Sequence, residues 1–204
     1  MELSELWFLL IAVLFVGFMF LEGFDFGVGM GSKFLAKNDI EKQMLNSAIG
    51  PTWAGNEVWL ITAGGAMFAA FPHWYATLFS GYYLPFLVLV IALMGRGVSL
   101  EVRSRVDHKH WRNAWDWAMF AGSILPPFLF GVLFSSLIKG LPIDGEMNMN
   151  AGFFDIVNVY TVVGGLAFVA LSYLHGLTFL SLKTEGDLRE RARKQAQKIY
   201  ALTG

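Results

Sequence analysis

Residues 6–30 read LWFLLIAVLFVGFMFLEGFDFGVGM. From Leu6 to Leu21 the stretch contains no charged side chain. A hydrocarbon core about 30 Å thick is crossed by roughly 20 helical residues, so this stretch is long enough to span a membrane as one helix. Two carboxylic acids, Glu22 and Asp25, lie near its end. The rest of the chain has to explain how acids are accommodated at that depth.

The composition agrees with a membrane protein. Of the 204 residues, 55% are hydrophobic and 15% are charged, and the mean hydropathy is +0.52; about a quarter of the residues in soluble domains are charged. The 15 basic and 16 acidic residues nearly balance, so no net charge favours a nucleic-acid partner. The absence of cysteine excludes disulfides, iron–sulfur clusters and thiolate metal sites.

Five segments reach the length of a membrane span. Backbone groups in lipid must be satisfied internally, and the segments lack the two-residue alternation of barrel strands, so we predict helices and an all-α transmembrane bundle. Pro126 and Pro127 should kink the fourth span. The predicted spans are residues 6–30, about 46–71, 75–96, 115–138 and 153–182.

The basic residues predict the orientation. They gather in the segments 33–42, 96–112 and 183–198, whereas the other side has only Lys139. By the positive-inside rule we expect a multi-pass membrane protein with its N-terminus outside and the loops after the first, third and fifth spans in the cytoplasm. The opening MELSELW has two acids and no Lys or Arg, so we expect it to be retained and not cleaved as a signal peptide.

The same pattern divides the chain into four parts. Residues 1–140 form a first four-helix bundle, 141–152 an outer loop and 153–183 a fifth span. Residues 184–204 form a basic cytoplasmic segment that turns apolar at Ile199. We expect this segment to lead toward a sixth helix that the sequence lacks.

Glu22 and Asp25 are three residues apart, so both lie on one face of a helix. With this orientation Asp25 lies about 12 Å of helix inward from Lys33. An ionised acid inside a membrane is costly unless it is paired, hydrated or protonated. Each acid therefore needs a partner, water or a proton.

Candidate partners lie at the same predicted depth on the next two spans: Trp53, Asn56 and Glu57 on the second, and Arg96 at the cytoplasmic end of the third. One interpretation is a buried salt-bridge network, with Arg96 bound to Asp25 or Glu22, that only fixes helix register. The other is a proton entry path or the polar end of an amphiphile-binding groove. The sequence alone leaves both open.

The histidines do not predict a redox centre in this chain. A haem with two histidine ligands needs both at one depth on facing helices. His73 follows the second span, His108 and His110 lie in a loop, and only His175 lies inside a span. We interpret His175 as a hydrogen-bonded core residue, and we expect no metal site, no bound cofactor and no catalytic residue here.

Four ordered blocks resemble a known family. GFDFGVGM, PTWAGNEVWLITAGGAMFAAFP, GRGVSLEVRSR and WRNAWDWAMFAGSILPP are similar to subunit II of the cytochrome bd quinol oxidases. The resemblance implies a respiratory complex that oxidises quinol and reduces oxygen to water with protons from the cytoplasm. It implies that haem b and haem d belong to subunit I, that subunit II is a structural and proton-conducting partner, and that a small third subunit can be present.

The resemblance also carries residue roles. Asp25, Trp53 and Arg96 match family positions that lie near a structural quinone in some members. The family acid of P-x-W-D-G-N, implicated in proton uptake in some members, is Ala54 here. Glu57 stands one helical turn later and could compensate, or the route could run through Asp25 or through subunit I.

The leading hypothesis is therefore a subunit of an oxidase that binds no haem and carries protons through a polar layer of Asp25, Glu22, Glu57 and Asn56. A proton-coupled transporter that uses Asp25 and Glu22 is one rival. A purely structural scaffold subunit is the other.

Overall fold

The computed structural model describes residues 2–203, and every regular element in that range is a helix, apart from one isolated bridge between Ile143 and Met149. The all-α class predicted from the sequence is confirmed. The helices are α1 (Leu3–Phe34), α2 (Asp39–Ile49), α3 (Trp53–Ala70), α4 (Pro72–Gly81), α5 (Tyr83–Val102), α6 (Lys109–Lys139), α7 (Phe153–Ile156), α8 (Val159–Lys183) and α9 (Gly186–Thr203).

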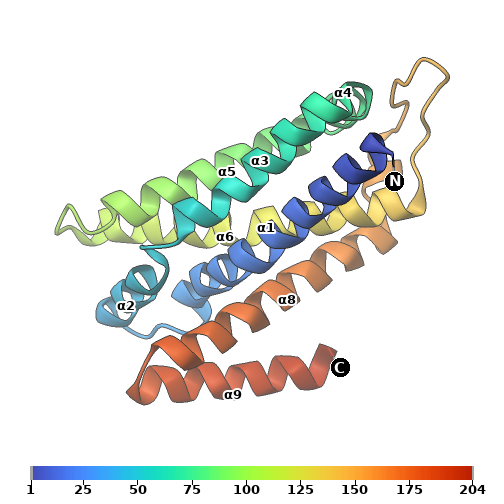
Figure 1. The fold of residues 1–204 in the computed structure, drawn as a ribbon. Helices are drawn as coiled ribbons and strands as arrows, with labels where there is room; N and C mark the ends of the chain where they lie inside the picture. The colour runs from blue at the N-terminus through green and yellow to red at the C-terminus, as the bar shows by residue number, and fades with distance from the viewer. Residues whose placement is uncertain (1, 204) are drawn as a thin grey trace.

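Helix α1 is the centre of the arrangement. It packs against α3, α6 and α8, while α6 also packs against α5 and α8 (Figure 1). Helix α9 turns back and packs along α8. The two acids of α1 therefore lie on a helix that has neighbours on several sides to bury them.

Four helices are long and apolar enough to cross a membrane: α1, α5, α6 and α8, with mean hydropathies of 2.3, 1.9, 1.8 and 1.7. Helix α3 is not among them, because Asn56 and Glu57 lie in its first turns. A helix with such polar groups must face protein or water at that end.

Three predicted spans are divided in the structure. The span expected at about 46–71 is interrupted between Ile49 and Trp53, next to Pro51, which has no amide to donate. The span expected at 75–96 is interrupted at Tyr82, between α4 and α5. The span expected from Phe153 begins only at Val159, because Asn158 caps α8 by accepting from the amides of Tyr160 and Thr161.

Helix α6, in which the sequence predicted a kink, is not divided. It runs as one α-helix through Pro126 and Pro127, and both prolines are buried.

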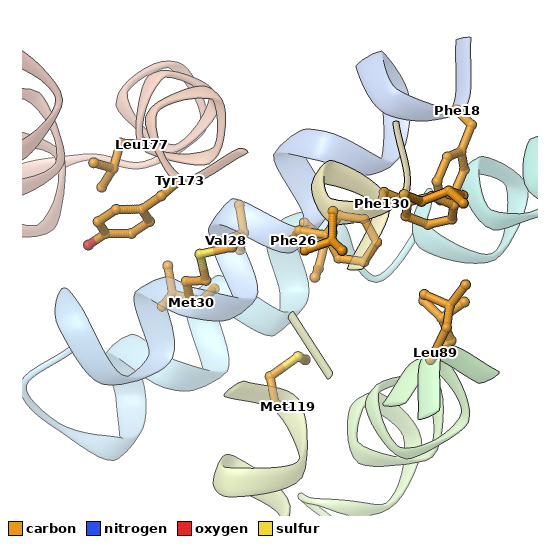
Figure 2. Close-up of a cluster of buried hydrophobic side chains, with 14 of the residues drawn as sticks. Phe18, Phe26, Val28, Met30, Leu89, Met119, Phe130, Tyr173 and Leu177 are labelled. Carbon is orange, nitrogen blue, oxygen red and sulfur yellow. The ribbon is translucent and has the colours of Figure 1, made fainter. Parts of the chain in front are cut away.

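The core lies on both sides of α1 (Figure 2). On one side Phe18 stacks edge to face on Phe130 of α6, with ring centroids 5.3 Å apart, and on Phe26 at 6.3 Å. On the other side Leu177 of α8 is fully buried. Edge-to-face aromatic pairs add to area burial, so these rings hold α1 and α6 together.

The ends of the bundle differ in charge. Helix α2, the α5–α6 turn and the α8–α9 turn lie at one end, whereas the N-terminus, α4 and the 140–152 segment lie at the other (Figure 1). The first end carries the basic segments 33–42 and 96–112 and the start of the third, which continues along α9, and the second end carries Lys139. This grouping is the one on which the predicted orientation depends.

Helices α1 and α8 cross with backbones in contact at Gly27 and Gly176. A Cβ atom at Gly27 would lie 2.7 Å from the Gly176 Cα, closer than real side chains approach. We expect Gly27→Ala to force the helices apart and to lower stability by about 1–3 kcal/mol. Thermal unfolding in detergent measures this.

The matched control is Gly64→Ala on α3, where an added Cβ meets nothing within 4 Å. That change should stabilise the helix by up to about 1 kcal/mol, because Ala is the better helix former. Equal unfolding temperatures for the two variants would contradict the close crossing.

Candidate functional site

A cluster of polar side chains is buried where α1, α3 and α5 meet. Glu22 and Asp25 come from α1, Asn56 from the first turn of α3, and Arg96 from the C-terminal half of α5. Glu22, Asp25 and Arg96 are fully buried, and Asn56 is 8% exposed. We call these four residues the buried polar cluster; the sequence predicted that they meet, and the structure brings them together.

Arg96 forms an ion pair with Glu22 and not with Asp25. Its Nη1 lies against Glu22 Oε1, but the angles at this contact are not those of a hydrogen bond. Both carboxylate oxygens of Glu22 and all three guanidinium nitrogens of Arg96 therefore have no hydrogen-bond partner among the described residues. The attraction between the two opposite charges is the main contact between Arg96 and Glu22, because it does not depend on the angle at which the groups meet. The unfilled hydrogen-bonding capacity leaves places for water.

Arg96 is further enclosed by apolar groups. Its guanidinium lies 4.8 Å from the ring centroid of Phe26, a cation–π contact. Gly122 of α6 lies against its Cβ, and a side chain at Gly122 would come within 2.7 Å of that atom. Arg96 is therefore fixed from three sides, with Glu22 as the one acid that pairs with it.

Asp25 is held by an amide. Asn56 Nδ2 donates to Asp25 Oδ2 over 2.7 Å and to the Leu21 carbonyl over 3.2 Å. The second oxygen, Asp25 Oδ1, is buried and has no hydrogen-bond partner among the described residues. Within residues 2–203 no cation forms an ion pair with Asp25, in contrast to Glu22.

Trp53 and Glu57 lie beside the cluster and not in it. The Trp53 ring packs over Gly97, where an added Cβ would come within 3.0 Å of it. Trp53 also lines a polar cavity of about 220 Å³ together with Gln43 and Asn46 of α2. Glu57 is half-buried and forms no ion pair within residues 2–203.

Ala54, at the position of the family acid, is exposed on the outer face of α3.

An apolar groove of about 640 Å³ runs along α1 between α4, α6 and α8. It is lined by Gly23 and His175 near the level of the cluster, but not by Glu22, Asp25 or Arg96. The cluster is therefore not the polar end of this groove, which removes that form of the amphiphile-groove interpretation.

His175 lies at the edge of that groove and contacts two aromatic rings. Its centroid is 5.2 Å from Phe20 and 5.7 Å from Phe24, and it is half-buried. No hydrogen bond to His175 is present within residues 2–203, so the expected hydrogen-bonded core histidine is instead packed on aromatic groups. Because no second histidine shares its groove, the described residues do not supply the pair of ligands that a bis-histidine haem requires.

A second polar cluster, which sequence reasoning missed, lies at the basic end of the molecule. Arg103 donates to Asp116 Oδ1 through Nε and to Asp39 Oδ1 through Nη2, both over 2.5 Å. Lys42 donates to Asp116 Oδ2 over 2.6 Å, and Arg112 to Asp39 Oδ2 over 2.7 Å. These five residues, the basic-end ion cluster, connect α2, α5 and α6.

The charges in this cluster are strongly coupled. The hydrogen bond from Arg103 lowers the pKa of Asp39 below its ordinary value of 3.8, so Asp39 is ionised at neutral pH. The available signal was Asp39 in the first turn of α2, but no spacing rule in the sequence joins residues 39, 103 and 116.

Taken together, these features define a class: a helical membrane protein in which acids and an arginine meet inside the bundle, with no group of three metal-ligating side chains within residues 2–203. Residues 3–204 match the family described as cytochrome bd terminal oxidase subunit II, and the chain belongs to that family. The resemblance inferred from the four sequence blocks is confirmed.

Individual relatives agree. The chain is 57% identical over 201 residues to cytochrome bd ubiquinol oxidase subunit 2 of Bacillus subtilis (strain 168), covering 98% of this chain and 60% of that protein. It is 41% identical over 205 residues to cytochrome bd-I ubiquinol oxidase subunit 2 of Escherichia coli (strain K12), covering 98% and 54%. The chain thus spans little more than half the length of the curated relatives it matches.

Proposed function

We propose that this chain is part of the subunit II of a bd-type quinol:oxygen oxidoreductase, and that it supports a haem-bearing subunit I without ligating haem. The family membership and the four apolar helices support this. In the complex, haem b and haem d belong to subunit I, a small third subunit can be present, and lipid and quinol are the surroundings. The chain crosses the bacterial cytoplasmic membrane several times with its N-terminus outside.

The proposed contribution to the reaction is proton delivery from the cytoplasmic side. Reduction of oxygen to water by quinol takes up protons, so a path must bring them through the protein to subunit I. The observation that carries this proposal is the Asp25 carboxyl group, which is fully buried and, within residues 2–203, has one oxygen without a hydrogen-bond partner and no ion pair. Acids inside membranes commonly relay protons.

The two acids of the buried polar cluster have different proposed roles. Arg96 favours the charged form of Glu22, because removing the charge of either partner would leave the other alone in the interior. Asp25 can accept a proton on Oδ1 while Oδ2 keeps its bond from Asn56, so protonation requires no rearrangement of α3. Glu57 and Asn56 complete the polar layer, and Glu57 is half-buried.

The positions carried over for a quinone also fall close together. Trp53 packs on Gly97, the residue that follows Arg96, and it lines the 220 Å³ cavity that borders α2 and the end of α5. We propose that a quinone near this chain would contact Trp53 first, with Arg96 behind it.

The rival functions make different demands. A proton-coupled transporter would have to work without a haem-bearing partner, and a pure scaffold would not need a buried carboxyl group left without a cation. The scaffold is the weaker rival, because burying the carboxyl group of Asp25 in the membrane interior is energetically unfavourable and a purely structural subunit does not require it.

Intact mass spectrometry of the membrane complex, combined with its absorption spectrum, tests the proposal. We expect this chain to be isolated with a larger haem-bearing subunit whose spectrum shows b- and d-type haem. A colourless protein that carries out transport by itself would contradict the oxidase assignment. A coloured complex that lacks this chain would also contradict it.

A further inference from the structure

A polar cavity of about 670 Å³ lies between α2 and the first turns of α6. Every residue that lines it is charged or capable of hydrogen bonding. Four of them are cations: Lys37, Lys42, Lys109 and Arg112. Neither the proton path nor the carried-over quinone positions use this cavity.

The cavity has more positive than negative charge. Its three aspartates are Asp39, Asp107 and Asp116, and each is already paired: Asp39 with Arg103 and Arg112, Asp116 with Arg103 and Lys42, and Asp107 with Arg112. The remaining cations, Lys37 and Lys109, are exposed and make no ion pair within residues 2–203. Neither ammonium group forms an ion pair within residues 2–203, although the carboxylate of Glu41, which accepts from the Lys37 amide, lies close enough to interact with the charge of Lys37.

The cavity lies at the level of the membrane surface. Helix α6 has no charged side chain from Trp117 to Ile138, so the apolar part of the helix begins directly after Asp116. Trp117, which follows the cavity residue Asp116 in the chain, is 54% exposed, and Phe34, three residues before the cavity residue Lys37, is 53% exposed. Lys33 lies 4.2 Å from the Trp117 ring centroid. Exposed tryptophan and lysine in this arrangement are typical of the boundary between headgroups and acyl chains.

We propose that this cavity binds the headgroup of an anionic phospholipid, with its phosphate between Lys37 and Lys109 and its acyl chains along the exposed faces of Phe34 and Trp117. Lys42 and Arg112 stay committed to the aspartates and give the cavity its shape. Asn38, His110 and Asn113 line the same cavity and offer hydrogen bonds to a polar headgroup. Basic pockets at helix ends in the membrane surface recognise anionic headgroups by this chemistry. The inference does not depend on the oxidase assignment.

Lysine acetylation of the purified complex in lipid nanodiscs tests the site without any variant. In nanodiscs that contain phosphatidylglycerol, Lys37 and Lys109 should be labelled less than in nanodiscs of phosphatidylcholine alone. Lys139, exposed at the opposite end of the bundle, is the internal reference. Equal labelling of Lys37 and Lys109 in the two lipids would overturn the proposal, and so would a fall in labelling that Lys139 shares.

Native mass spectrometry of lipid retention gives the second measurement. We expect Lys37→Gln and Lys109→Gln to weaken retention of phosphatidylglycerol by roughly fivefold each, whereas Lys139→Gln should not change it. If inorganic phosphate protects the two lysines equally well in lipid-free detergent, the site binds a free anion and the lipid assignment is wrong. Protection that requires another subunit but no anionic lipid would show a protein interface, which also overturns it.

Discussion

Asp25→Asn should slow oxygen consumption by the assembled complex by roughly tenfold or more, because the substitution removes the group proposed to accept the proton. Asparagine matches aspartate in size and can keep a hydrogen bond with Asn56, so the fold should be retained. The haem absorption bands should stay unchanged, because the expected loss concerns protonation and not ligation. Oxygen-electrode rates with quinol as donor, compared with haem content on the same sample, measure the effect.

The matched control is Asp187→Asn, which changes an exposed aspartate in the first turn of α9. It should leave the turnover rate unchanged. Full activity of Asp25→Asn would rule out Asp25 as an obligatory proton carrier, and the buried polar cluster would then be structural. Loss of haem in the Asp25 variant would show that the residue supports assembly.

Arg96→Met should destabilise the protein by about 3–5 kcal/mol, the typical result of leaving a buried charge without its partner. Arg96 and Glu22 are both fully buried, so the carboxylate of Glu22 would be left as an unpaired charge away from bulk solvent. Methionine keeps much of the arginine side chain's length, which limits the loss of packing against Phe26 and Gly122. Thermal unfolding and the yield of folded protein in detergent measure the effect.

The double variant Glu22→Gln with Arg96→Met separates charge from packing. It removes both charges of the ion pair, and it should recover most of the stability lost in Arg96→Met. Arg96→Met paired with Asp25→Asn is the control, and it should recover much less, because Asp25 is not the ion-pair partner. Equal recovery in both double variants would mean that Arg96 neutralises the two acids without distinguishing them.

The composition and the apolar stretches predicted the class of fold, because a span of about 20 apolar residues has few structural alternatives in lipid. They did not predict the interruptions at Tyr82 and between Ile49 and Trp53, since hydropathy averages over a window and does not resolve a short break. The late start of α8 was readable only from the Asn158 cap, a local hydrogen-bond signal inside an apolar region.

The buried polar cluster was predicted as a set but not as a set of pairs. Depth in the membrane placed Arg96 beside two acids, and depth alone cannot choose between residues three positions apart on one helix face. Side-chain packing makes that choice: Arg96 pairs with Glu22, and Asn56 binds Asp25. The basic-end ion cluster was missed because its members come from three separate segments of the sequence.

The unbroken course of α6 has one further consequence. Pro126 and Pro127 have no amide hydrogen, so the carbonyl oxygens four residues earlier, at Gly122 and Ser123, lack the donor that a regular helix would give them. Gly122 lies directly against Arg96. Helix α6 therefore gives up two main-chain hydrogen bonds inside the bundle, and one of the two freed carbonyl groups belongs to the glycine that allows α5 and Arg96 to pack closely against it.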